Sequence, residues 1–219
     1  MIGNVLVTGG TGFVGKWMQY AQPINLKVTY LNRIEYKKYK WVNENFDYIV
    51  HLANIDPVEV LRHSHLAKIL YCSSGAAYDQ TTQYADNKRQ WEYKCVTSGL
   101  QVVIARLFTF YGDGLDEEKA ISQFIHSAKL NEPIVVYNND TIRSYMHGKE
   151  LGAWMWSILV HGKNGETYDV GSDTPINMLQ LAKAVKIKYN SNSEIISANI
   201  PSPCPYYMPR DTNKTKGLL

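Results

Sequence analysis

The sequence predicts an α/β fold built on a doubly wound parallel β-sheet. Three observations lead to this prediction. Short β-branched segments recur along the chain, helical segments separate them, and a glycine-rich turn follows the first of them. Strands that alternate with helices are joined by right-handed crossovers, which bury a parallel sheet between two helical layers. A chain of 219 residues with 45% hydrophobic residues is long enough to form one sizeable core.

The expected strands are short apolar runs, rich in β-branched residues, of the kind that a buried parallel sheet requires. In chain order they are 4–8, 28–31, 48–52, 69–73, 102–106, 134–137 and 167–170. Helices are expected at 57–66 and 84–95, between the earlier strands, and at 177–187 near the end. The four prolines within 199–209 predict an irregular tail.

The helix with the clearest periodicity is expected at 149–160. Its apolar residues recur at helical spacing and form a single stripe, made of Leu151, Trp154, Met155, Ile158 and Leu159. We therefore expect its tryptophans to be core or interface residues and not ligand contacts.

Composition excludes several classes of protein. A formal net charge of +3 without a Lys/Arg stripe argues against nucleic acid as a partner. No apolar run approaches the roughly 20 residues that cross a bilayer, and the chain opens directly on a strand. We therefore expect a cytoplasmic location and no membrane partner. The three cysteines, Cys72, Cys95 and Cys204, have no metal-like spacing, which predicts free thiols and no metal.

The first predicted strand runs into a turn with glycines at positions 9, 12 and 15. Glycine allows a tight turn and a close approach of the backbone to a pyrophosphate, and the helix expected from Phe13 directs N–H groups at the phosphates. The sequence Gly9 to Val14, including Thr11 and Gly12, therefore predicts a Rossmann-type site for NAD or NADP.

The end of the second strand bears on the choice between these cofactors. An acid usually binds the adenosine ribose at this point, but here Asn32 and Arg33 follow the strand. Because Arg33 could pair with a 2′-phosphate, NADP is slightly favoured. The alternative is that Arg33 stacks on adenine or faces solvent.

A phenol, an ammonium and a hydroxyl are expected to meet beside the nicotinamide. Tyr84 and Lys88 are four residues apart, hence on one side of a helix, and Ser73 and Ser74 end a predicted strand. Because a phenol titrates near 10, a nearby cation must help it to act as a base. Ser74 would hold the substrate oxygen while Tyr84 moves its proton and the cofactor moves the hydride.

With these motifs in this order, the chain resembles the extended short-chain dehydrogenase/reductase family, in its nucleotide-sugar epimerase/dehydratase branch. The segments that carry the resemblance are TGGTGFVG (8–15), DYIVHLAN (47–54), YCSSGAAY (71–78), YADNKRQWE (84–92), ARLFTFYGDG (105–114), IRSYMHGKEL (142–151) and ETYDVGS (166–172). The resemblance implies Ser74, Tyr84 and Lys88 as a catalytic triad. It implies that the cofactor lies beside Tyr84 and Lys88 and also beside Gly9, Gly12, Phe13, Val14, Leu52 and Ala53.

The resemblance also implies a substrate site for a nucleotide-sugar. Ser74 would contact the sugar, and Thr109 stands where the family commonly has an asparagine in the sugar pocket. Arg143 matches an arginine that often contacts the nucleotide's phosphates. The alternative for Arg143 is a structural ion pair with a nearby acid.

Departures from the family's pattern narrow the expected chemistry. Gly75 and Ala76 replace the Asp-Glu pair that performs elimination in family dehydratases, and Asp113 and Gly114 stand where some epimerases have a histidine. A 4-epimerase or a 4-keto reductase, which needs only the triad and the cofactor, is therefore expected. The alternatives are a non-catalytic NAD(P)-binding sensor or scaffold, and a dehydratase with atypical acid/base residues.

By the same resemblance, the expected dinucleotide-binding domain is 1–112 with 144–172 returning to the sheet. A small C-terminal substrate-binding subdomain is expected from 113–143 and 173–219. The chain is shorter than typical members, and the trimmed region includes part of the helical interface of family dimers. A homodimer like that of the family is therefore in question.

Overall fold

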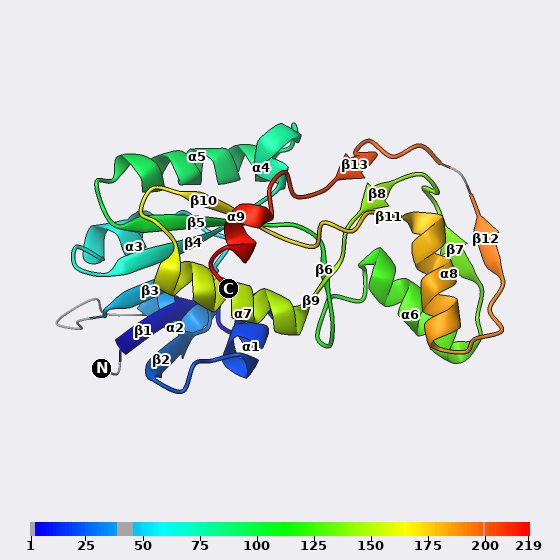
Figure 1. Cartoon of the computed structure of the whole chain (residues 1–219), viewed down its shortest axis with the longest axis horizontal. Helices are drawn as coiled ribbons and strands as arrows, with labels where there is room; N and C mark the ends of the chain where they lie inside the picture. Colours follow the sequence, from blue (N-terminus) through cyan, green and yellow to red (C-terminus); the bar gives the residue numbers. More distant parts are fainter. Residues whose placement is uncertain (1–2, 39–45, 199) are drawn as a thin grey trace. The chain divides into compact units, whose positions relative to one another are not determined.

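The computed structural model describes residues 3–38, 46–198 and 200–219 (Figure 1). The chain divides into two compact units. Unit 1 comprises Met1–Phe108, Gly148–Val170 and Pro209–Leu219, and unit 2 comprises Thr109–His147 and Gly171–Met208. Within the described ranges, no helix is long and apolar enough to cross a membrane.

Unit 1 contains a six-stranded sheet in which every neighbouring pair of strands is parallel. Its strands are β1 (Gly3–Thr8), β2 (Leu26–Leu31), β3 (Tyr48–His51), β4 (Lys68–Ser74), β5 (Val102–Leu107) and β10 (Thr167–Val170). They lie in the order β10-β5-β4-β3-β1-β2. The predicted doubly wound parallel sheet is confirmed.

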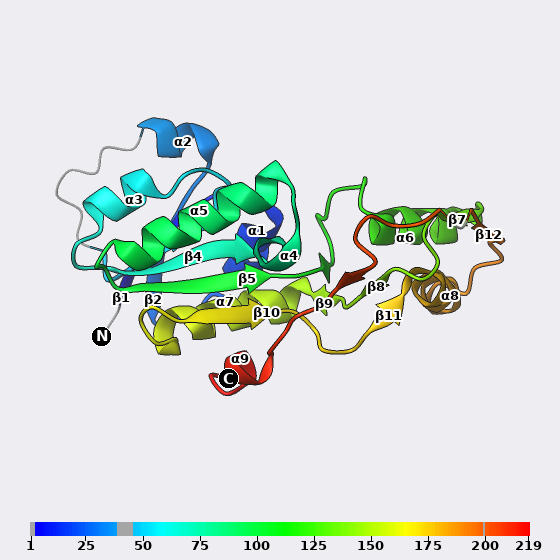
Figure 2. The same cartoon turned by 90° about the horizontal axis from the view of Figure 1, so that it is seen from above.

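Helices cover both faces of this sheet, which explains why its central strands β1, β3, β4 and β5 are buried along most of their length. The helices of unit 1 are α1 (Phe13–Tyr20), α2 (Arg33–Lys38), α3 (Val58–His63), α4 (Ala76–Asp79), α5 (Gln83–Thr97), α7 (Gly148–His161) and α9 (Asn213–Lys216). Leu6, Ile49 and Ile69 on the sheet pack with Val60 of α3 and Cys95 of α5. Helices α1 and α7 pack together on the face opposite α5 (Figure 1), and Figure 2 shows α5 running alongside β4.

The apolar stripe predicted for α7 is buried. Leu151, Trp154, Met155, Ile158 and Leu159 are each at most 4% exposed. The helix also approaches α1 very closely, because a Cβ atom at Gly152 would lie 2.3 Å from the carbonyl oxygen of Trp17. This contact requires glycine on α7.

The strand order reverses between β1 and β3. From β1 the chain crosses to β2 on one side, while β3, β4 and β5 follow on the other. Thr8 at the end of β1 is in register with His51 at the end of β3. Ligands of open α/β sheets bind outside the carboxyl ends of the strands at such a reversal. The fold therefore places the glycine turn and the segment after β3 at the same edge of the sheet.

The end of the chain returns to unit 1. The Arg210 backbone N–H donates to Asp169 Oδ2 at 2.7 Å, and the Thr215 hydroxyl donates to the Asp169 carbonyl at 2.7 Å. These bonds attach the tail to the end of β10. The range 173–219 had been expected to lie wholly in the smaller part, but Pro209–Leu219 packs with unit 1 because Asp169 binds it.

Unit 2 consists of two helices and several short strands. The helices are α6 (Ala120–Leu130) and α8 (Met178–Lys188), and the strands are β6 (Phe110–Tyr111), β7 (Ile134–Val136), β8 (Ile142–Arg143), β9 (Met146–His147), β11 (Ile176–Asn177), β12 (Ile195–Ser197) and β13 (Tyr206–Tyr207). Asn177 and Gln180 form a capping box at the start of α8. Ile121 and Phe124 of α6 pack with Ile134, Leu181 and Val185 in a core of their own.

A buried carboxylate joins α5 to the sheet. Glu92 on α5 accepts hydrogen bonds from Arg106 on β5, with Nε at 2.9 Å from Oε1 and Nη2 at 2.5 Å from Oε2. The Ser73 hydroxyl on β4 donates to the same carboxylate. The Glu92 side chain is only 9% exposed, so this ion pair is shielded from solvent.

We predict that Glu92→Ala lowers the free energy of unfolding by about 3 kcal/mol, because it leaves the Arg106 guanidinium buried without its partner. Glu59→Ala, which removes the carboxylate of an exposed Arg62–Glu59 pair, is the matched control and should cost about 0.5 kcal/mol at most. Urea unfolding followed by circular dichroism measures both. Equal losses for the two variants would contradict the assignment.

Candidate active site

The turn after β1 has a backbone geometry that lets other groups approach the main chain closely. Gly9 has φ +75°, in the left-handed region that favours glycine, and a Cβ atom there would lie 2.8 Å from the backbone nitrogen of Ala53. A Cβ atom at Gly15 would lie 2.4 Å from the carbonyl oxygen of Gly10. At Gly12 the nearest contact of a Cβ atom would be 3.4 Å away, so the outer side of the turn has room for a ligand.

Helix α1 begins at this turn, so the positive end of its dipole lies at the turn. Gly12 is its N-cap in an extended conformation, and among the described residues no side chain caps the helix. Its first turn contains no acidic residue. Thr11 is exposed, and Phe13 and Val14 are half-buried. Free N–H groups and the helix dipole together suit the phosphates of a dinucleotide.

The segment after β3 forms the other side of this edge. The Leu52 backbone N–H donates to the carbonyl of Thr8 at 3.1 Å, which fixes the segment against β1. Ala53 follows directly beside Gly9. The structure thus brings together Leu52, Ala53 and the glycine turn.

Asn32 has a role that the sequence analysis missed. Its Oδ1 accepts hydrogen bonds from the backbone N–H groups of Ile34 and Glu35, at 2.8 and 2.9 Å, and Glu35 Oε2 accepts from the Asn32 N–H at 2.7 Å. Asn32 is therefore the N-cap of α2, in a capping box that the spacing Asn-x-x-Glu signals. Arg33 is exposed, and its guanidinium has no hydrogen-bond or ion-pair partner in the described ranges.

The structure brings Ser74, Tyr84 and Lys88 together within unit 1. Thr82 caps α5 by accepting from the Ala85 N–H at 3.2 Å, so that Tyr84 lies on the first turn of the helix. The Lys88 ammonium is 5.7 Å from the centre of the Tyr84 ring and donates to the Cys72 carbonyl at 2.9 Å. Tyr84 is 42% exposed and Lys88 only 3%, so the phenol is accessible while the ammonium is buried beneath it.

The pKa values follow from these surroundings. Burial raises the pKa of Tyr84, whereas its hydrogen bond with Ser74 acts to lower it. Burial also lowers the pKa of Lys88, and the nearby Cys72 and Glu92 act in the opposite direction. In the protein without ligand the phenol is thus protonated at neutral pH. It can act as an acid directly, and as a base only with further stabilisation of the phenolate.

A network beyond the triad holds the segment between Ser74 and Tyr84. The Tyr78 ring on α4 lies between two guanidinium groups, with Arg106 at 4.2 Å and Arg210 at 3.9 Å from its centre. Its hydroxyl donates to Asp169 Oδ1 at 3.0 Å, and Arg210 also pairs with Asp79. No local pattern in the sequence signals this network, since it joins residues as far apart as 79 and 210.

Gly75 is fixed by packing. A Cβ atom at this position would lie 2.3 Å from the buried Phe108 ring. Ala76 follows, with its N–H donating to the Ser74 hydroxyl oxygen at 3.2 Å. The two positions that carry an acid pair in family dehydratases therefore hold no proton-transferring group, and the first has no room for one.

Thr109 and Arg143 belong to unit 2. The Thr109 carbonyl accepts from the Met146 N–H at 3.1 Å. Arg143 donates to the carbonyl of Cys204 at 2.8 Å and lies 5.6 Å from the centre of the Tyr207 ring. No carboxylate in the described residues pairs with Arg143, so the alternative of a structural ion pair finds no partner there.

The remaining polar candidates of the sequence have structural surroundings. His51 is fully buried, is hydrogen-bonded to Thr8 at 2.8 Å, and has its pKa lowered by burial to about 4. Cys72, Cys95 and Cys204 are free thiols. Within the described part of the chain, no three His, Cys, Asp or Glu side chains converge to hold a metal ion.

Comparison with known proteins agrees with this geometry. The family model described as "NAD dependent epimerase/dehydratase family" matches residues 38–171. UDP-glucuronic acid decarboxylase 4 of Arabidopsis thaliana is 24% identical over 99% of this chain. The chain spans 64% of the length of that relative and 28% of the length of a second decarboxylase from the same plant.

Solved structures show the same fold. The dTDP-glucose 4,6-dehydratase of Bacillus anthracis, in complex with NAD, superposes with a TM-score of 0.80 at 16% identity, covering 98% of this chain and 89% of that one. RMD from Pseudomonas aeruginosa, complexed with NADPH, gives 0.77 at 20% identity, covering 99% and 92%. The glycine turn, the helix that bears Tyr84 and Lys88, and the matched residues together establish that this chain belongs to the NAD-dependent epimerase/dehydratase family, within the extended short-chain dehydrogenases/reductases.

Proposed function

We propose that this protein is an NAD(P)-dependent nucleotide-sugar oxidoreductase that acts at one sugar carbon, as a 4-epimerase or a 4-keto reductase. The observation that carries the proposal is the arrangement of the triad. An exposed phenol is hydrogen-bonded to Ser74, and the Lys88 ammonium lies 5.7 Å from its ring. These are the groups needed to transfer a proton at an alcohol or a ketone.

Each residue has a distinct task in this mechanism. Ser74 donates a hydrogen bond to the substrate oxygen and orients it toward Tyr84. In the oxidative direction the Tyr84 phenolate removes the hydroxyl proton, and in the reductive direction the phenol returns it. Lys88, held by the Cys72 carbonyl, stabilises the phenolate. Bound NAD(P) supplies the hydride acceptor or donor for the carbon atom.

The cofactor fits the edge of the sheet where β1 and β3 end. Gly9 leaves free the space that a Cβ atom would fill, and there is room for a ligand beside Gly12. The start of α1 offers backbone N–H groups to the pyrophosphate. Leu52 and Ala53 form the opposite wall. We assign these residues to cofactor binding.

Elimination chemistry is disfavoured by the residues that follow Ser74. Gly75 and Ala76 cannot move a proton, and Asp113 and Gly114 offer no histidine for epimerisation next to a ketone. What remains is redox chemistry at a single carbon. A tightly retained NAD favours the 4-epimerase and an exchangeable NADPH favours the reductase, so analysis of the nucleotide that co-purifies separates the two.

The choice between NAD and NADP depends on two opposed charges at the start of α2. Arg33 is exposed and can pair with a 2′-phosphate, which favours NADP. Glu35, two residues after Arg33, holds its carboxylate at the N–H of Asn32 and would repel a second anion at this place. Because Asn32 is committed to the helix cap, we assign the 2′-phosphate to Arg33.

We expect Tyr84→Phe to lower kcat by about 10² to 10⁴-fold, the range that a general acid or base contributes, with cofactor affinity nearly unchanged. The assay is a panel of UDP-, GDP-, dTDP- and CDP-sugars with product analysis. Tyr93→Phe, an exposed phenol further along the same helix, is the matched control. Undiminished turnover by Tyr84→Phe would refute the mechanism, and cofactor binding without turnover by the unaltered protein would favour the sensor or scaffold.

We predict that Ser74→Ala moves the rising limb of the oxidative pH profile to higher pH by about one unit, the size of a charge-assisted hydrogen bond. The phenolate is the active form in oxidation, so the rate rises as pH passes the Tyr84 pKa. Ser74 lowers that pKa, and its removal therefore raises it. A profile of kcat/KM against pH measures the shift, because it reports the free enzyme, in which the Ser74 hydroxyl is bonded to Tyr84 and not yet to substrate. A limb that stays in place would show that Ser74 does not act on the phenol.

We predict that Arg33→Ala weakens NADPH binding about tenfold and leaves NADH binding unchanged, since only NADPH presents a 2′-phosphate. Glu35→Gln should strengthen NADPH binding, because it removes a negative charge from the same place. Isothermal titration calorimetry measures both cofactors with each variant. Equal loss of NADPH and NADH affinity in Arg33→Ala would instead indicate that Arg33 contacts the adenosine common to both.

A further inference from the structure

Lys88 is a buried lysine whose charge needs compensation. It is 3% exposed, and in the described part of the chain its ammonium makes one hydrogen bond, to the Cys72 carbonyl at 2.9 Å. No carboxylate among the described residues forms an ion pair with it. An ammonium has three donors, and a buried charge is costly unless other groups stabilise it. The proposed reaction needs Lys88 as a cation, so other groups must stabilise its charge.

Three aromatic rings lie close to the Lys88 ammonium. Its nitrogen is 5.4 Å from the centre of the Tyr71 ring, 5.7 Å from that of Tyr84 and 5.5 Å from that of Trp91. Tyr71 approaches from β4, whereas Tyr84 and Trp91 lie about one turn before and one turn after Lys88 on α5. The face of a ring attracts a cation at such distances, and the attraction grows when water is excluded.

The titratable groups that face Lys88 provide no anion for it at neutral pH. They are Tyr71 and Cys72 on β4, His51 on β3, and Tyr84, Glu92 and Cys95 on α5. Burial raises the pKa of the two thiols and the two phenols and lowers the pKa of His51 to about 4, so these five groups are uncharged. Glu92 is bound through both oxygens by Arg106. The groups that remain to stabilise the Lys88 cation are the Cys72 carbonyl and the three rings.

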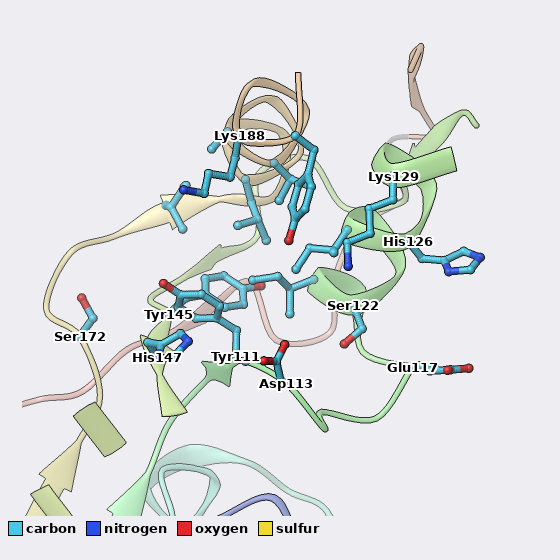
Figure 3. Close-up of a pocket in the computed structure, with 18 of the residues that line it drawn as sticks. Tyr111, Asp113, Glu117, Ser122, His126, Lys129, Tyr145, His147, Ser172 and Lys188 are labelled. Atoms are coloured by element: carbon cyan, nitrogen blue, oxygen red, sulfur yellow. The ribbon is translucent and has the colours of Figure 1, made fainter. Parts of the chain in front are cut away.

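A lysine of unit 2 shows how this arrangement differs from an ordinary ring contact. Lys129 lies on the wall of a cavity of about 650 Å³, and Figure 3 shows it extending from α6. Its ammonium is 5.5 Å from one ring in the described residues, that of Tyr189. The Lys129 side chain is exposed, so water solvates its charge. Lys88 is shielded from water, and three rings stand in the place of that solvent.

Packing fixes the two rings that lie outside the triad. Tyr71 is fully buried and stacked on the His51 ring, with 6.1 Å between the ring centres, and His51 is itself hydrogen-bonded to Thr8 at 2.8 Å. The Tyr71 hydroxyl has no hydrogen-bond partner among the described residues, so Tyr71 acts on Lys88 through its ring. Trp91 packs against the same core from α5.

We propose that Tyr71 and Trp91 are positioning residues that keep Lys88 charged and in place beneath Tyr84 by presenting their rings to its ammonium. The proposal rests on the proposed function, in which Lys88 stabilises the Tyr84 phenolate. A ring face attracts the ammonium and not the neutral amine, so it favours the protonated form of Lys88. Loss of a ring should therefore lower the pKa of Lys88 and weaken its support of the phenolate.

The test measures the pKa of Lys88 directly, by NMR of the whole protein labelled with [ε-¹³C]lysine, and the Lys88 signal is assigned by its loss in Lys88→Met. Trp91→Leu should lower this pKa by about one unit, the size of a desolvated cation–π contact. Trp91→Phe restores a ring and should recover at least about half of the shift. Tyr93→Leu, which removes an exposed ring from the same helix, is the matched control and should leave the pKa unchanged.

Tyr71 is tested by separating its ring from its hydroxyl. Tyr71→Phe keeps the ring and should leave the pKa of Lys88 in place, and thermal unfolding of each variant checks that the fold persists. A Lys88 pKa that is unchanged in Trp91→Leu, equally shifted in Tyr93→Leu, or not recovered in Trp91→Phe would each overturn the proposal. A shift in Tyr71→Phe as large as that in Trp91→Leu would do so as well, because it would assign the effect to the hydroxyl.

A second measurement uses the proposed reaction in the reductive direction, which needs both the Tyr84 phenol and the Lys88 ammonium. Burial lowers the pKa of Lys88 and raises that of Tyr84, so kcat/KM falls as pH rises through the pKa of Lys88. Trp91→Leu should move this limb to lower pH by about one unit, whereas a purely structural loss would lower the rate at every pH. A limb that stays in place would overturn the proposal. An NMR shift without turnover of any nucleotide-sugar would refute the proposed function and leave the effect of the rings on Lys88 established.

Discussion

The proposed catalytic arrangement of Ser74, Tyr84 and Lys88 depends on one buried ion pair, in which Arg106 and Ser73 bind the carboxylate of Glu92. A buried carboxylate is stable only when its oxygens are satisfied, and here a guanidinium binds both of them. The pair fixes α5 across β4 and β5. Ser73 precedes Ser74, and Glu92 follows Lys88 by one helical turn, so that any sliding of α5 would separate the hydroxyl from the phenol and the ammonium.

The exposed fraction of the side chain falls sharply from Tyr84 to Lys88 along the first turns of α5, and the proposed chemistry requires this difference. Tyr84 is 42% exposed, where a substrate can reach it, while Lys88 is 3% exposed. The Lys88 ammonium donates to the Cys72 carbonyl, which holds it below the phenol. A charge in such a low-dielectric position acts on the phenolate more strongly than an exposed charge would. The helix thus presents a reactive group at the surface and supports it from the core.

Local patterns in the sequence predicted most of the fold and the proximity of Ser74, Tyr84 and Lys88. The strands follow from apolar runs, and α7 from its stripe. The capping box of Asn32 and Glu35 had a local signal that was missed, and Glu92 stands four residues after Lys88 on the same helical face. The Tyr78 network had no such signal, because Asp169 and Arg210 lie far away in the chain and meet only after folding.

The position after Ser74 is the structural ground on which the proposed reaction differs from that of family dehydratases. A side chain at Gly75 would meet the Phe108 ring at 2.3 Å, and this ring is buried and lies 6.4 Å from the ring of Tyr78. An acid could therefore enter only if Phe108 moved, which would disturb the stack that holds α4. The lack of an acid at position 75 and the packing of the Phe108 ring against it therefore depend on each other. In the proposed reaction the triad therefore acts without a neighbouring acid pair, and the proposal depends on Gly75 as much as on Tyr84.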